Sequence, residues 1–324
     1  ASTANLGAAS NIALAGAQDI LALSGFNGTF GNTVSGNGKL QVTNSSNATL
    51  TSSNGVGSAV TVDIANATLN LADIALFNNA LTGNGLLNID TTNNAFNFGG
   101  TTGTAFAGTV DMKNSQFALN GNNTSALTNA KLVASAGTAM VVGSGNQAIG
   151  DLTLHGATTT FNTGSLITTD TLAVTDNSTV RVDPTLSTGG NLLDQDTGNS
   201  SQLINSSNTL SAAELAKLAL EDTTGNSLGS GTTQNVIQGG NTVAQALYNY
   251  ALSGDGGGLS VTSMLTQLAL ASGQSLTLTS QGALNADNTL VAKLTAAGNL
   301  IIGTDNTEIT LSNIANDYTG TTTV

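Results

Sequence analysis

Residues 82–89, with the sequence TGNGLLNI, contain the pattern that decides the fold, and residues 35–42, SGNGKLQV, repeat it. In both stretches a Gly-Asn-Gly turn precedes a short segment in which apolar and polar residues alternate. Alternation with a period of two is typical of a strand with one buried face, and Asn and Gly are typical of tight turns. A second unit, aromatic-x-Gly-Thr, occurs at residues 26–30, 106–110 and 318–322. Such recurrence predicts a chain of turns and short strands.

Similar alternating segments continue along the chain, with Asn, Gly, Ser and Thr between them. They lie at residues 67–71, 116–120, 151–154, 172–174, 179–183, 275–279 and 308–311. Short strands at this spacing also occur in sandwiches and barrels. A parallel β-helix is favoured because no linker interrupts the length, the turn units recur, and Asn and Thr are abundant enough to form hydrogen-bonded ladders between stacked coils.

The composition supports a folded chain with a narrow core. The 324 residues include 39 Gly, 1 Pro, no Cys and no Trp; 39% are hydrophobic and 8% are charged. Disordered chains combine low hydrophobicity with high charge or Pro, so disorder is disfavoured. Without Cys there is no disulfide framework and no thiolate metal site. Aromatic residues are only 3%, so we expect stability from many small aliphatic layers rather than from aromatic anchors.

The net charge of −13 excludes several partners. Six basic residues are scattered among 19 acidic ones, whereas nucleic acids and anionic membranes bind basic patches. No apolar run approaches the ~18 residues of a membrane-spanning helix, and the first ten residues do not resemble a signal peptide. We therefore expect no nucleic-acid partner and no direct membrane contact.

One region departs from the strand pattern and divides the chain into three parts. We expect β-helix at residues 1–189 and 272–324, and an inserted, partly helical excursion at residues 190–271, packed on the solenoid. Ser211 and Glu214 form a capping-box pattern before the apolar positions 215, 218 and 219, which predicts a helix with one buried face. Residues 242–252 and 261–271 are weaker helix candidates, and the second of them could equally form a strand.

Several stretches resemble the repeat units of AIDA-type autotransporter passengers, a family that includes aggregation and biofilm adhesins. They lie at residues 106–111, 117–119, 145–152, 311–313 and 316–324. The resemblance implies a right-handed parallel β-helix at the bacterial cell surface, exported through the outer membrane. Its membrane contact would be made only by a C-terminal β-barrel that is absent from this chain. It also implies a role in adhesion, autoaggregation or biofilm formation.

Catalytic and metal chemistry are not expected. Polysaccharide-active β-helices need clustered carboxylates and a basic residue, and the single His155 is interpreted as an exposed turn residue. Residues 253–258 have Gly256 where a serine protease would carry its nucleophile. Residues 194–199 begin like a calcium loop but lack its later ligands, so a solvated acidic turn is favoured over calcium binding by Asp194 and Asp196. We expect no enzyme activity, no cofactor and no metal.

The leading hypothesis is an adhesin. Its partner would be a copy of itself on a neighbouring cell, or a host extracellular-matrix protein or glycan. Candidate ligand-binding residues are Asp194, Asp196, Tyr248 and Tyr250, because Tyr offers a large contact area with a polar tip. The alternative for the two tyrosines is that they pack inward. The alternative for the whole chain is a structural spacer without a ligand site of its own.

Overall fold

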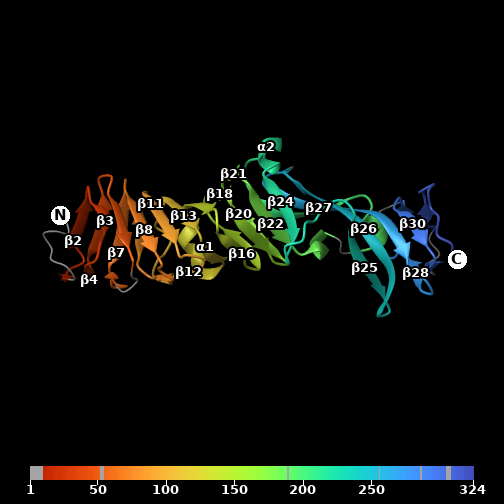
Figure 1. Cartoon of the computed structure of the whole chain (residues 1–324), viewed down its shortest axis with the longest axis horizontal. Helices are drawn as coiled ribbons and strands as arrows, with labels where there is room; N and C mark the ends of the chain where they lie inside the picture. The colour runs from red at the N-terminus through yellow and green to blue at the C-terminus, as the bar shows by residue number, and fades with distance from the viewer. Residues whose placement is uncertain (1–9, 52–54, 188–189, 255, 285–286, 304–307) are drawn as a thin grey trace. The chain divides into compact units, whose positions relative to one another are not determined.

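The computed structural model describes residues 10–51, 55–187, 190–254, 256–284, 287–303 and 308–324 (Figure 1). It is 53% strand and 6% helix, and its parallel coils stack into a β-solenoid of about 14 turns. The expected all-β parallel β-helix is therefore confirmed. The chain forms two compact units, each made of several segments. Unit 1 contains residues 1–181, 203–219 and 254–259, and unit 2 contains residues 182–202, 220–253 and 260–324.

Unit 1 is built from stacked parallel sheets. One eight-stranded sheet has the order β21-β18-β15-β13-β11-β8-β6-β3. Its strands are β3 (Asn27–Thr29), β6 (Asn47–Leu50), β8 (Thr68–Ala72), β11 (Leu86–Asp90), β13 (Thr109–Lys113), β15 (Lys131–Ser135), β18 (Leu152–His155) and β21 (Leu172–Asp176). A second parallel sheet forms another face of the coils. Its strands in unit 1 are β9 (Leu76–Phe77), β12 (Ala95–Phe98), β14 (Gln116–Leu119), β16 (Ala139–Val142), β19 (Thr158–Phe161) and β22 (Ser178–Val182).

Strands of three further sheets complete the coils of unit 1. Their strands are β1 (Asn11–Leu14) with β4 (Thr33–Gly36); β2 (Ile20–Ser24), β5 (Lys39–Thr43), β7 (Thr61–Ala65) and β10 (Leu81–Gly83); and β17 (Gly145–Ala148) with β20 (Ser165–Thr168). Two further strands are β23 (Asn199–Asn205) and β24 (Leu218–Asp222); like β22, each has residues in both units.

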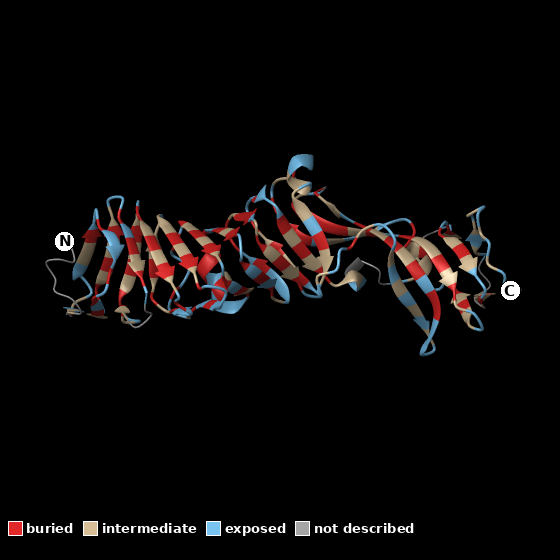
Figure 2. Cartoon of the chain, in the orientation of Figure 1, coloured by how far each residue is buried: buried red, intermediate tan, exposed pale blue. Residues whose placement is uncertain are grey.

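Columns of aliphatic side chains form the core of unit 1. The eight-stranded sheet aligns one such column, each member at most 1% exposed: Ala48, Leu69, Leu87, Val110, Leu132, Leu152 and Leu172. Neighbours in the column are between 18 residues (Leu69 to Leu87) and 23 residues (Leu87 to Val110) apart, which is the length of one coil. In strands such as β8, β11 and β13 every second residue is buried, so the alternation in the sequence becomes the banding of buried and less buried residues in Figure 2.

Aromatic residues add to the expected aliphatic layers and contribute more to the core than their scarcity suggests. All eight Phe residues of the chain are buried. Phe96 contacts Phe98 edge-to-face with ring centroids 4.9 Å apart, and Phe77 and Phe117 extend the cluster at 6.5 Å. Such pairs add about 0.5–1.5 kcal/mol beyond the burial of their area.

The Gly-Asn-Gly units form turns that lead into strands, as expected. Gly83 ends β10 with φ = +100°, and β11 begins at Leu86, directly after Gly85. A Cβ atom on Gly83 would overlap the carbonyl oxygen of Ile64 in the preceding coil. Only Gly tolerates both the positive φ and this close approach between coils.

The described part of unit 1 contains two helices, and both differ from what the sequence predicts. α2 (Ala212–Leu215) has the expected capping box, with the Glu214 N–H donating to Ser211 Oγ at 3.3 Å and the Ser211 N–H donating to Glu214 Oε2 at 2.9 Å. The helix has only four residues, none of them buried, and β24 follows at Leu218, so the expected longer helix with one buried face is wrong. α1 (Gly121–Leu127) was not expected; it buries Asn123, whose Oδ1 accepts the N–H of Phe98 at 2.7 Å.

Unit 2 combines an antiparallel hairpin with further parallel coils. β25 (Thr232–Gln238) pairs with β26 (Asn241–Ser253), and β26 pairs with β27 (Leu259–Leu270). The other elements are the 3₁₀ turns η3 (Pro184–Ser187) and η4 (Leu192–Asp194), and β28 (Ser275–Leu278), β29 (Thr289–Leu290), β30 (Lys293–Ala296), β31 (Asn299–Ile302), β32 (Thr310–Leu311) and β33 (Thr322–Thr323). β30 pairs in parallel with β27, and β28, β31 and β33 stack in one parallel sheet.

The helix candidate at residues 242–252 is wrong, because these residues lie in β26. For residues 261–271 the strand alternative is confirmed, because residues 261–270 lie in β27. Gly239 and Gly240, both with positive φ, form a two-residue turn between β25 and β26. This geometry matches the twist of two antiparallel strands, so the hairpin overrides the weak helical spacing.

Candidate functional site

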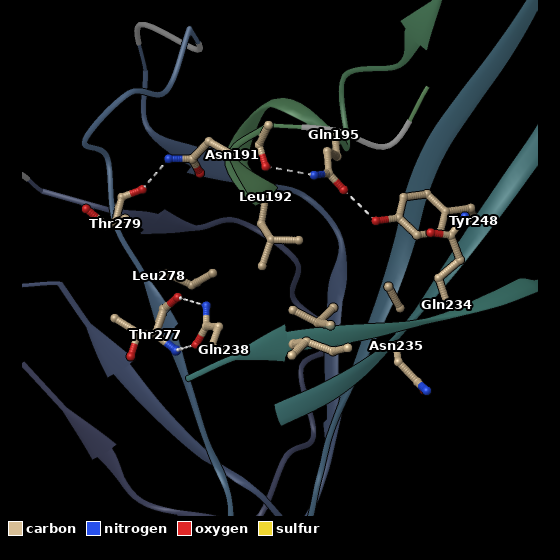
Figure 3. A pocket seen from close by; sticks show the side chains of 14 residues that line it. Asn191, Leu192, Gln195, Gln234, Asn235, Gln238, Tyr248, Thr277, Leu278 and Thr279 are labelled. Atoms are coloured by element: carbon tan, nitrogen blue, oxygen red, sulfur yellow. Dashed lines mark hydrogen bonds between the residues drawn. The ribbon is translucent and has the colours of Figure 1, made fainter. Parts of the chain in front are cut away.

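A hollow of about 300 Å³ in unit 2 is the candidate binding site (Figure 3). Four parts of the unit line it: residues 190–195 around η4, residues 234–238 of β25, Ala246 and Tyr248 of β26, and residues 277–279 at the end of β28. None of the 14 described residues that line it carries a charge. Its volume lies at the lower end of the range for ligand pockets. We call it the unit 2 pocket.

Amide side chains cap the open edge of β28 at one wall of this pocket. β31 pairs with one edge of β28. At Thr277, Gln238 Nε2 donates to the carbonyl oxygen at 2.8 Å, and Gln238 Oε1 accepts the N–H at 2.8 Å. Asn191 Nδ2 donates to the carbonyl oxygen of Thr279 at 2.7 Å. Two side-chain amides therefore occupy the place that the peptide groups of a neighbouring strand would take, and they hold the wall in a fixed geometry.

Tyr248 and Gln195 form the opposite wall and are both 3% exposed. The Tyr248 hydroxyl donates to Gln195 Oε1 at 2.5 Å, and Gln195 Nε2 donates to the carbonyl oxygen of Gly190 at 3.1 Å. Burial raises the pKa of the Tyr248 phenol to about 12, so the phenol is neutral and donates a hydrogen bond at physiological pH.

The second candidate tyrosine lies inside unit 2 and outside the pocket lining. Tyr250 is 6% exposed; its hydroxyl donates to the carbonyl oxygen of Pro184 at 2.9 Å and accepts from Gln234. The rings of Tyr248 and Tyr250 pack 5.9 Å apart. Both rings adopt the inward-packed arrangement, and only Tyr248 reaches the pocket.

The two candidate carboxylates hold the backbone of a later segment. Both oxygens of Asp194 accept the N–H of Leu284, at 2.9 and 3.0 Å. Asp196 Oδ2 accepts the N–H groups of Val291 and Ala292. Burial raises the pKa of Asp196, although these two hydrogen bonds act in the opposite direction.

The described residues include no group of three or more His, Cys, Asp and Glu side chains placed to hold a metal ion. The only histidine, His155, is exposed at the end of β18, with Nδ1 3.0 Å from Thr175 Oγ1. In the described part of the chain, no helix has the length and hydropathy needed to cross a membrane.

Unit 1 carries a second candidate surface on the outer face of the eight-stranded sheet. Asn70 Nδ2 donates to Asn47 Oδ1 at 2.7 Å, and Asn88 Nδ2 donates to Asn70 Oδ1 at 2.9 Å. Asp111 stands next to Asn88 in register. We call Asn47, Asn70, Asn88 and Asp111 the polar ladder; it confirms the expected hydrogen-bonded ladders between coils.

The polar ladder has a defect at its last step. Asn88 Oδ1 is buried and has no hydrogen-bond partner among the described residues. The reason is chemical: the next member, Asp111, is a carboxylate and has no proton to donate.

Sequence reasoning did not find Asn191, Gln195 or Gln238 as site residues. Asn and Gln are frequent in this chain, and no local pattern separates these three from the others. A local signal exists for Gln238 alone, since the Gly239-Gly240 turn between alternating segments predicts the hairpin that carries it.

Relatives of this chain include two long proteins of Escherichia coli (strain K12). The chain is 31% identical over 312 residues to the uncharacterized protein YuaQ, an alignment that covers 89% of this chain and 23% of YuaQ. It is 32% identical over 301 residues to the uncharacterized lipoprotein YdeK, covering 82% of this chain and 22% of YdeK. No family model and no solved structure matches the chain. The chain thus spans less than a quarter of the length of these curated relatives, and it is similar to one segment of each.

Proposed function

We propose that this chain is part of the passenger of an autotransporter adhesin and that it associates with copies of itself on neighbouring cells, as in aggregation or biofilm formation. The repeat units at residues 106–111 and 316–324 support the family. The name of YdeK as a lipoprotein supports a location at the cell envelope. Export through the outer membrane to the cell surface is part of the proposal, and catalysis is not.

The polar ladder is the observation that carries self-association. Its members recur once per coil on one sheet. Hydrogen bonds among Asn47, Asn70 and Asn88, and the one that Asp111 accepts from the Ser135 hydroxyl, fix the side chains before any partner arrives. Preorganised groups lose less entropy on binding. Many weak contacts repeated along such a surface add up through multivalency, even where each contact alone is negligible.

Attachment to a host matrix protein or glycan is the other adhesive mechanism, and the unit 2 pocket would serve it. A structural spacer is the alternative from a different class. The spacer is supported by the regular stacking of coils in unit 1, which needs no ligand.

Sedimentation velocity over a wide range of protein concentration tests self-association. The test variant carries Thr68→Glu and Thr109→Glu, which add charge to the outer face of β8 and β13, beside the polar ladder. The control carries Ser58→Glu and Thr104→Glu at exposed positions outside the strands, with the same change in net charge. We expect the native chain and the control to associate with increasing concentration and the test variant to remain monomeric.

The same variants displayed on bacterial cells should differ in the rate at which the cells settle. A native chain that stays monomeric at every concentration and does not aggregate cells would contradict self-association and favour the spacer. Equal association of the test and control variants would show that the polar ladder is not the contact surface.

A further inference from the structure

The unit 2 pocket has a lining whose chemistry selects a class of ligand. The chain has a net charge of −13, yet no charged side chain is among the described residues that line the pocket. The nearest acidic groups along the chain, Asp194 and Asp196, are engaged by backbone N–H groups of residues 284, 291 and 292. A charged ligand would lose its hydration here without gaining a counter-charge, which is costly. The lining therefore favours an uncharged ligand.

The polar groups of the pocket are amides that are already held in place. Gln195 and Gln238 each use one N–H and one lone pair of the side-chain amide for the bonds described above. A primary amide has two N–H groups and two acceptor lone pairs, so each of these amides retains the capacity to donate one hydrogen bond and accept another. A donor and an acceptor side by side on one rigid amide match a pair of adjacent hydroxyl groups, because a hydroxyl both donates and accepts.

The rest of the lining is apolar. Leu192, Val236 and Leu278 contribute aliphatic surface, and Figure 3 shows Leu192 and Leu278 between the Gln195 and Gln238 amides. The Tyr248 ring borders the pocket beyond Gln195. A ligand that fits must therefore present hydroxyls at its edge and C–H groups on its face. A pyranose ring has this combination, and a hollow of about 300 Å³ accommodates one such ring.

An extended peptide is a poorer match for the same pocket. It would bind by adding a strand to the open edge of β28. That edge is already satisfied at Thr277 by Gln238 and at Thr279 by Asn191, so a peptide would have to displace both amides. A saccharide would use the amides as they stand.

We propose that the unit 2 pocket binds one ring of an uncharged saccharide, through the Gln195 and Gln238 amides and the aliphatic surface between them. This inference develops the glycan-attachment alternative of the proposed function and is independent of self-association. Sedimentation tests the polar ladder of unit 1, and saccharide binding tests unit 2, so either can fail alone.

Saturation-transfer NMR on the whole chain tests the proposal. The probes are the methyl glycosides of glucose, galactose, mannose, N-acetylglucosamine and N-acetylgalactosamine, with glucuronic acid and N-acetylneuraminic acid as charged probes. We expect at least one neutral glycoside to bind with a Kd on the order of 1 mM and the charged probes to give no transfer. In ¹⁵N spectra, the side-chain amide signals of Gln195 and Gln238 should shift with the same ligand.

A matched pair of variants locates the binding. Val236→Trp places a large ring in the pocket, and Thr233→Trp places the same ring on the exposed side of β25, outside the pocket. We expect Val236→Trp to weaken binding at least tenfold and Thr233→Trp to leave it unchanged. Three results would overturn the proposal: no transfer to any neutral glycoside, equal transfer to charged probes, or native binding by Val236→Trp. Displacement of the Gln238 amide by an uncharged extended peptide, without saccharide binding, would also overturn it.

Discussion

Replacing Asp111 by Asn should repair the defect in the polar ladder. Asn88 Oδ1 is buried without a hydrogen-bond partner among the described residues, and Asp111 is its register neighbour in the next coil. The side-chain amide introduced by Asp111→Asn would donate from its nitrogen to Asn88 Oδ1. Its oxygen would still accept the Ser135 hydroxyl, which lies 2.5 Å from the carboxylate in the native chain. The substitution therefore gains one hydrogen bond and keeps the existing one.

The size of the effect follows from two opposing contributions. Giving a buried acceptor its donor is worth about 1 kcal/mol. The substitution removes the ion pair between Asp111 Oδ2 and Lys113 Nζ, which lie 4.0 Å apart. The two side chains are 24% and 45% exposed, so this costs at most a few tenths of a kcal/mol. We expect a net stabilisation of about 0.5–1 kcal/mol. For a chain of this length, with about 2.1 cal/mol/K of unfolding entropy per residue, that is a rise in Tm of roughly 1 °C.

Local hydrogen exchange is the more sensitive assay, because coils of a solenoid open in part rather than all at once. Backbone amides of β11 and β13 should exchange about two- to fivefold more slowly in Asp111→Asn. Asp63→Asn is the control: it removes the same charge, but both oxygens of Asp63 already accept, from Gln41 at 2.9 Å and from Thr82 at 2.8 Å. It should not slow exchange. Equal slowing in both variants, or none in Asp111→Asn, would refute the ladder argument and point to relief of general charge repulsion.

Three further substitutions test other parts of the fold. Gly83→Ala should lower the free energy of unfolding by more than about 1 kcal/mol in a urea titration, because it forces a Cβ against the preceding coil at φ = +100°. Ser211→Ala should cost about 1 kcal/mol in the exchange protection of α2. Hydrogen bonds from the Ser211 N–H and hydroxyl lower the pKa of Glu214, so this stability is present above about pH 4.3 and is lost as pH falls through the lowered pKa. The variant keeps the N–H donor and loses only the hydroxyl, so its pH dependence should be weaker but not absent. Tyr248→Phe should cost about 1–3 kcal/mol, because it leaves Gln195 Oε1 buried without its donor.

Two matched controls accompany these variants. Gly103→Ala also has a positive φ, +69°, but a Cβ there meets only the Thr101 carbonyl oxygen at 4.0 Å; the difference from Gly83→Ala isolates the contact between coils. Tyr318→Phe removes a hydroxyl bonded to Thr322 at an exposed site, and it should change stability by less than about 0.5 kcal/mol. If the controls match the test variants, the close approach and the buried hydrogen bond are not the causes.

The sequence alone determined the repeated coil of this protein. Alternation with a period of two places one face of each strand inward wherever the strand lies, and the Gly-Asn-Gly units mark the turns at Gly36 and Gly83. The capping box at Ser211 was also predictable, because all its atoms come from residues three apart. These features depend on neighbours in sequence, and short-range sterics decide them.

Tertiary structure decided the rest. α1 carries no recognisable signal in its sequence GNNTSAL, and it is held by contacts such as that from Asn123 to Phe98. Residues 242–252 became a strand because β25 and β27 pair with them on both sides. The unit 2 pocket brings together Asn191, Gln238 and Thr277 from segments up to 88 residues apart, as in the bond from Asn191 to Thr279. The physical reason is that an amide side chain has the same hydrogen-bonding groups wherever it stands; only the long-range pairing of strands determines which backbone edge it meets and which hollow remains beside it.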